Sequence, residues 1–68
     1  MGLRPIVQLR ENIKALLLAR NEKQKPLAIW ADIDPSALSK FLQGKREIQL
    51  AKLDRVADFF GIAGYQLF

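Results

Sequence analysis

A chain of 68 residues can build one hydrophobic core, so we expect a single domain that spans residues 1–68. Eleven lysines and arginines against seven aspartates and glutamates give a formal net charge of +4, which favours a polyanionic partner. The sequence contains no cysteine and no histidine, which excludes disulfide bonds, thiolate chemistry, most zinc sites and the usual general base. We therefore expect a protein that is not an enzyme and that uses no metal ion and no cofactor.

Apolar runs such as residues 15–19 are far shorter than the roughly 20 residues that span a bilayer. The N-terminus also lacks the apolar core of a signal peptide. These features predict a cytoplasmic protein with no membrane partner. No segment of the sequence suggests a sensor for a small-molecule effector.

Proline and glycine fall where helices should begin and end. Apolar residues recur at three- and four-residue steps after Pro5, which predicts a first helix over residues 5–20, with Asn21 as a left-handed exit residue. The polar stretch 22–25 opens a second helix that carries Pro26 in its first turn and ends near residue 31.

A third helix is predicted over residues 35–43, because Asp34 is a strong N-cap, Pro35 suits the first helical position and Gly44 closes the helix. A fourth helix follows over residues 50–60 and is ended by Gly61. Residues 62–68 predict a short or frayed fifth helix, and no window alternates as a strand does. The fold class is therefore all-α. The expected inward stripe of the fourth helix consists of Leu50, Leu53, Val56, Ala57 and Phe60.

The segment 24–44 contains two short helices joined by about three residues. Such a pair packs tightly only if its crossing point carries small side chains, and Ala28 and Ala31 supply them. Ile33 is the expected apolar plug of the turn. The side chains expected to share a core between the two helices are Leu27, Leu38 and Phe41.

On the third helix, the apolar residues occupy one side, so a small polar stripe must line the other. Hydroxyl groups and one cation on such a stripe suit the base edges of a DNA major groove. Two alternatives remain: short hydroxyl side chains often bond their own backbone, and most surface lysines are merely solvated. The stripe consists of Ser36, Ser39, Lys40 and Gln43.

Cations flank this stripe. Lys23 and Lys25 lie at the start of the second helix, where free N–H groups and the helix dipole favour phosphate. Lys45 and Arg46 follow the third helix, in a loop where charge is also expected without any ligand.

From residue 9 to residue 68, the ordered set of residues resembles the phage repressor and Cro-like helix-turn-helix proteins, the XRE family, without a gap. The resemblance implies a compact five-helix bundle of the lambda-repressor-like type, with the helix-turn-helix in helices two and three. It further implies a prokaryotic or phage-encoded transcriptional regulator, cytoplasmic and associated with the nucleoid when bound to DNA. Such a regulator binds double-stranded DNA as a homodimer, and its third helix reads the major groove of a pseudo-palindromic operator. The matching residues include Arg20, Gln24, Leu27-Ala28, Ala31, Ile33, Ser36, Leu38-Ser39-Lys40-Phe41, Gly44-Lys45, Leu50, Leu53, Ala57 and Gly61-Ile62.

The resemblance also assigns roles to single positions. Gln24 matches the phosphate-contacting start of helix two, while residues 44–46 match the loop that contacts the DNA backbone. With the residues chosen above, the expected base-reading set is Pro35, Ser36, Ser39 and Lys40. The expected phosphate-contacting set is Lys23, Gln24, Lys25, Gln43, Gly44, Lys45 and Arg46.

Several positions depart from the family pattern. Asp32 stands where the family commonly has glycine, and it must adopt a left-handed turn at some cost. Pro35 can offer a base only apolar contact, which predicts modest specificity. Leu17 and Leu42 occupy the positions of a common Arg–Glu ion pair, and we expect them to form one apolar contact instead.

Exposed apolar residues raise a second functional hypothesis. Ile29 and Trp30 should face outward from helix two, unless Trp30 covers residues 3–6 or shields the first helix. The tail residues Tyr65, Leu67 and Phe68 either fold onto the core or pack across a two-fold axis. These five residues are candidate interface residues, and they would serve an alternative role as a protein-interaction module of the antitoxin or adaptor kind.

Overall fold

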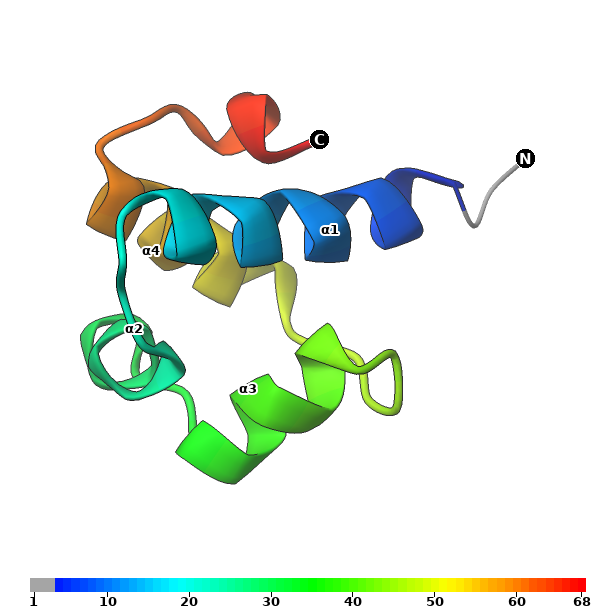
Figure 1. Cartoon of the computed structure of the whole chain (residues 1–68). Helices are drawn as coiled ribbons and strands as arrows, with labels where there is room; N and C mark the ends of the chain where they lie inside the picture. Colours follow the sequence, from blue (N-terminus) through cyan, green and yellow to red (C-terminus); the bar gives the residue numbers. More distant parts are fainter. Residues whose placement is uncertain (1–3) are drawn as a thin grey trace.

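The structure is a computed structural model that describes the backbone of residues 4–68 and the side chains of residues 7–68. Over that range the chain is all-helical, with four α-helices, one 3-10 helix and no strand (Figure 1). No helix of the described range is both long enough and apolar enough to cross a membrane. The elements are α1 (Arg4–Ala19), α2 (Gln24–Ala31), α3 (Pro35–Leu42), α4 (Leu50–Phe60) and the 3-10 helix η1 (Gly64–Leu67).

The helix boundaries agree with the sequence-based prediction to within about one residue because the capping signals are strong. Each α-helix is followed by a residue with a positive φ. The backbone N–H of the residue after that one donates to the carbonyl oxygen of the residue five positions before the donor. After α1, for example, Asn21 has a φ of 53° and the N–H of Glu22 donates to Leu17 O at 2.8 Å. The residues that end the four helices in this way are Asn21, Asp32, Gly44 and Gly61.

The turn between α2 and α3 is set by two aspartates. Asp32 adopts the left-handed conformation, with a φ of 57°, and Ile33 N donates to Ala28 O at 2.8 Å. The carboxylate of Asp34 accepts a hydrogen bond from Ala37 N at 3.3 Å and so caps α3, with Pro35 in the first helical position. The predicted cap and the predicted left-handed residue are both confirmed.

The tail departs from the five-helix prediction. Residues 64–67 form a single 3-10 helix in place of a fifth α-helix. Ala63 has no side-chain oxygen to cap a helix, and the side chain of Gln66 accepts from Ala63 N at 2.8 Å instead. A segment this short, with glycine as its first helical residue, gains too little from backbone hydrogen bonds to extend into an α-helix.

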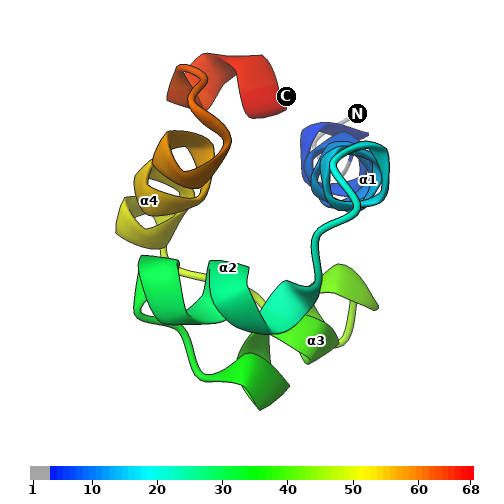
Figure 2. The ribbon, with the colours of Figure 1, turned by 60° about the vertical axis from the view of Figure 1, so that its left-hand side comes forward.

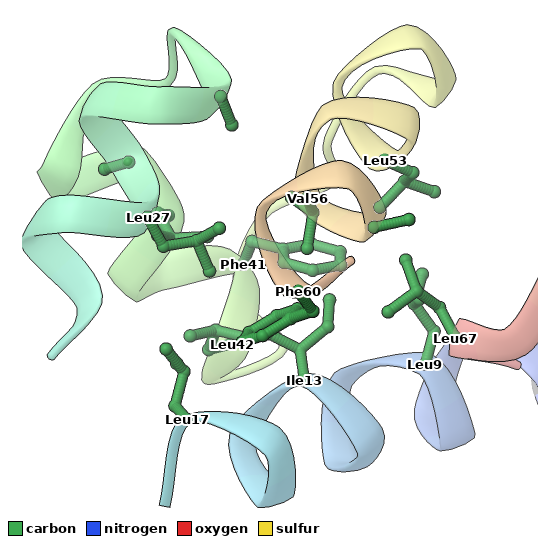
Figure 3. Close-up of a cluster of buried hydrophobic side chains, with 14 residues drawn as sticks. Leu9, Ile13, Leu17, Leu27, Phe41, Leu42, Leu53, Val56, Phe60 and Leu67 are labelled. Atoms are coloured by element: carbon green, nitrogen blue, oxygen red, sulfur yellow. The ribbon is translucent and has the colours of Figure 1, made fainter. Parts of the chain in front are cut away.

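The core is one cluster of apolar side chains to which every element contributes, and these side chains point toward one another (Figure 3). Leu17 and Leu42 are both buried in this cluster, which agrees with the apolar replacement of an ion pair. The small residues Ala28 and Ala31 are fully buried, as expected at a close helix crossing. The members of the cluster are Leu9, Ile13, Leu17, Leu27, Ala28, Ala31, Leu38, Phe41, Leu42, Leu53, Val56, Ala57, Phe60 and Leu67.

The composition of the core decides where two residues discussed above lie, one of them outside the core and one inside it. Leu50, expected on the inward stripe of α4, is 76% exposed, because the first turn of that helix extends past the core that Leu53 begins to fill. Leu67, a candidate interface residue that the sequence left open between the core and a two-fold contact, is 0% exposed and belongs to the core. The side-chain amide of Asn12 fixes this part of the tail by donating to Leu67 O at 2.6 Å.

The helices are arranged so that α3 lies at one edge of the molecule, while η1 lies at the opposite edge beyond α1 and α4 (Figures 1 and 2). The end of α1 is tied to the end of α4 by Arg20, whose guanidinium donates to Phe60 O at 2.7 Å. The same guanidinium lies 5.4 Å from the centroid of the Phe60 ring, a cation–π distance. These contacts join α1 to α4, while α3 turns its exposed residues away from the core.

Candidate nucleic-acid interface

The outward face of α3 carries the predicted polar stripe. Ser36 and Lys40 are exposed on this helix, opposite the fully buried Leu38. Ser39 is half-buried, and its hydroxyl accepts a hydrogen bond from the side-chain amide of Gln43 at 3.1 Å. The accessible centre of the stripe therefore consists of Ser36 and Lys40, with Pro35 exposed at its N-terminal end.

The start of α2 supplies a second part of the candidate interface. Lys23, Gln24 and Lys25 are all exposed there. Lys23 is the N-cap residue and forms no side-chain capping bond, in contrast to Asp34 at the start of α3. A helix start of this kind offers its first N–H groups and two ammonium groups to an anion.

The loop after α3 supplies the third part. Gly44 has a φ of 80°, and its N–H donates to Phe41 O at 2.9 Å, while Lys45 N donates to Lys40 O at 2.8 Å. This closure is a Schellman motif, which turns the chain sharply at the end of the helix. Lys45 and Arg46 follow the turn and are exposed.

Two residues near this surface were missed by the sequence analysis. The guanidinium of Arg10 lies against Gly44, since a Cβ built on that glycine would be 3.5 Å from Arg10 Cζ. The ammonium of Lys52 donates to the backbone carbonyl of Asp32 at 2.9 Å and to its carboxylate at 3.3 Å. Both contacts join segments distant in sequence, and a periodicity pattern carries no signal for such pairs.

Four of the five candidate interface residues are exposed, two on α2 and two on the tail. Ile29 and Trp30 are 69% and 54% exposed, and the Trp30 ring meets the Phe59 ring edge-on with centroids 6.2 Å apart. Tyr65 and Phe68 are exposed on the tail, whereas Leu67 between them is buried. The alternative that Trp30 covers residues 3–6 concerns side chains that lie outside the described residues.

No family model and no curated protein sequence matches the chain. A solved structure does match it: the crystal structure of the restriction-modification controller protein C.AhdI from Aeromonas hydrophila. The two chains superpose with a TM-score of 0.83 over 94% of this chain and 97% of the controller protein, at 23% sequence identity. The chain therefore shares its helix-turn-helix fold with this controller protein.

Proposed function

We propose that the chain is a transcriptional regulator that binds double-stranded DNA and reads its sequence with α3. The observation that carries this proposal is the division of α3 into a buried apolar face and an exposed polar face centred on Ser36 and Lys40. An α-helix with small polar side chains fits the width of the major groove. The fold shared with a controller protein supports the same role.

The proposed mechanism divides affinity from specificity. Lys23 and Lys25 approach backbone phosphates on one side of α3, and residues 45–46 approach them on the other, which makes binding dependent on salt. Lys40 donates to base-edge acceptors such as the O6 and N7 atoms of guanine. Pro35 offers apolar contact to a thymine methyl group, while Ser36 can donate or accept a hydrogen bond.

A homodimer would place two copies of α3 in successive major grooves, about 34 Å apart. The exposed tail residues Tyr65 and Phe68 are the proposed contact surface. They flank Leu67, which is buried in the core, so the surface is held in place before association. A two-fold arrangement of this kind requires an operator with an inverted repeat.

Selection of bound sequences from a random duplex DNA pool at about 150 mM salt tests this function, because non-specific charge attraction is already weakened there. We expect enrichment of an inverted repeat whose half-sites lie one helical turn apart. The matched variant Lys40→Ala should enrich a more degenerate sequence. Recovery of the same unselected background by both proteins would contradict sequence reading by α3.

The exposure of Ile29 and Trp30 favours a second candidate function, binding to another protein. In this function, the two side chains on α2 form part of a contact surface with Phe59. The double variant Ile29→Ser with Trp30→Ser separates the two functions. Unchanged DNA selection together with an unchanged regulatory effect contradicts the second role, whereas loss of the regulatory effect with intact DNA selection supports it.

A further inference from the structure

Arg10 reaches from α1 to the loop that follows α3. Its Cζ and Nη2 atoms each lie 3.5 Å from the position that a Cβ would occupy on Gly44, and its Nε atom lies 3.6 Å from it. Three guanidinium atoms at nearly equal distances show that the planar group lies against the loop. The guanidinium is thus placed directly beside the segment that carries Lys45 and Arg46.

Arg10 forms no ion pair within 4 Å with a carboxylate of the described residues. The ion pairs formed within that range are Lys14 with Glu11 and Lys52 with Asp32. Arg10 and Arg46 line the same surface hollow, and the only acidic side chain among the described residues of its lining is Glu47, which forms no ion pair with either arginine within 4 Å. A positive charge left without a partner beside two further cations favours an anionic ligand.

The backbone conformation favours glycine at position 44, because its φ of 80° is rarely adopted by residues with a side chain. The Arg10 guanidinium lies at ordinary van der Waals distance from the place of a Cβ on this residue, so the glycine is not needed to admit it. An arginine suits this place better than a lysine, because its planar group can rest on the loop while its outer N–H groups remain available to phosphate oxygens.

We propose that Arg10 is a third cation of the phosphate-binding loop and contacts a DNA backbone phosphate together with residues 45–46. The proposal rests on the proposed function, and it extends the interface to α1, an element to which the sequence analysis assigned no DNA contact. The ligand group is a phosphodiester, so the contact adds affinity without adding sequence preference.

The salt dependence of duplex DNA binding tests this contact. The logarithm of the binding constant is measured against the logarithm of the salt concentration for the wild type, for Arg10→Gln and for the matched control Arg55→Gln. Arg55 is exposed on α4 and forms no ion pair within 4 Å among the described residues, so both variants lose the same charge. Arg10→Gln should reduce the slope by about 0.9 and weaken specific and random DNA by a similar factor, on the order of tenfold.

A wild-type slope in folded Arg10→Gln would overturn the proposal. Arg10→Met, which keeps an unbranched chain in the hollow, serves as a second variant and must show the same loss of slope. Equal slopes for the wild type, Arg55→Gln and both Arg10 variants would refute this contact alone. Absence of any salt-dependent DNA binding by the wild type would refute the proposed function itself.

Discussion

Single residues at the ends of α3 determine both where this helix begins and what it presents. Asp34 and Pro35 could be recognised in the sequence because an N-cap and a first-position proline act within a few residues. The partial burial of Ser39 could not be recognised in the same way. Its position depends on how α3 packs against α1 and α2, and its hydroxyl is engaged by Gln43.

The cap formed by Asp34 gives a stability prediction. Asp34→Ala removes the acceptor of the Ala37 N–H group and should lower the free energy of unfolding by about 1 kcal/mol. Urea denaturation followed by circular dichroism measures this change. Asp58→Ala, an exposed aspartate in the last turn of α4, is the control and should change stability by less than about 0.5 kcal/mol. Equal effects of the two substitutions would contradict the capping role.

Lys40 and Lys45 should differ in how they affect DNA binding. Lys40→Ala should reduce discrimination between the selected site and random DNA by about 1–3 kcal/mol, the usual contribution of a good base contact. Lys45→Ala should weaken both DNA sequences together and reduce the salt slope by about 1. Competition binding with the two duplexes measures both quantities. The division of roles fails if both variants lose the same factor on both duplexes.

At the scale of elements, the sequence predicted the helices well because each one carries its own stop signal. The positive-φ residues Asn21, Asp32, Gly44 and Gly61 mark the ends of the four α-helices. The tail was predicted less well, since a segment of four helical residues is decided by tertiary contacts such as the bond from Asn12 to Leu67 O.

The contact of Lys52 on α4 with Asp32 in the turn of the helix-turn-helix gives a prediction about stability and DNA binding. Lys52→Met removes two hydrogen bonds to Asp32, at the turn that orients α3. We expect a loss of about 1 kcal/mol in unfolding free energy. We also expect weaker DNA binding with an unchanged salt slope, because no phosphate contact is lost. Lys14→Met, which breaks an exposed pair within α1, is the control and should leave both properties nearly unchanged. A reduced slope in Lys52→Met would instead indicate direct phosphate contact.

The small residues at the helix crossing give another prediction. Ala28 is fully buried on α2, so Ala28→Leu adds volume to a closely packed site and should cost about 1–3 kcal/mol of unfolding free energy. Thermal unfolding followed by circular dichroism measures the loss. The control Ala51→Leu places the same side chain at an exposed position of α4. A tolerated leucine at position 28 would contradict close packing at the crossing.

For the whole molecule, the sequence was sufficient to predict an all-helical helix-turn-helix fold, and the similarity to a controller protein agrees with it. The sequence could not show which surface residues meet across the fold. Arg10 and Gly44 are 34 positions apart, and Asp32 and Lys52 are 20 positions apart. The sequence left the place of Leu67 open for the same reason, because an apolar residue near the end of a chain can face the core or a partner with equal local plausibility, and the structure places it in the core.

We predict that the whole molecule self-associates through its tail. Phe68→Ser should weaken the proposed dimer, because it removes an exposed aromatic ring from the contact surface while leaving the buried Leu67 in place. Sedimentation velocity over a range of protein concentrations measures the change. Trp30→Ser is the control on α2 and should leave the association unchanged. A monomeric wild type at all concentrations, on and off DNA, would contradict the dimer.

DNA reading by α3 is tested most directly by a titration of isotope-labelled protein with the selected duplex, followed through the backbone amide resonances of the protein. We expect the largest shifts at residues 36–40 of α3 and at residues 44–46, with much smaller changes for the same residues on a scrambled duplex. Shifts confined to Ile29, Trp30 and the tail, with α3 unaffected by either duplex, would contradict DNA reading by this helix.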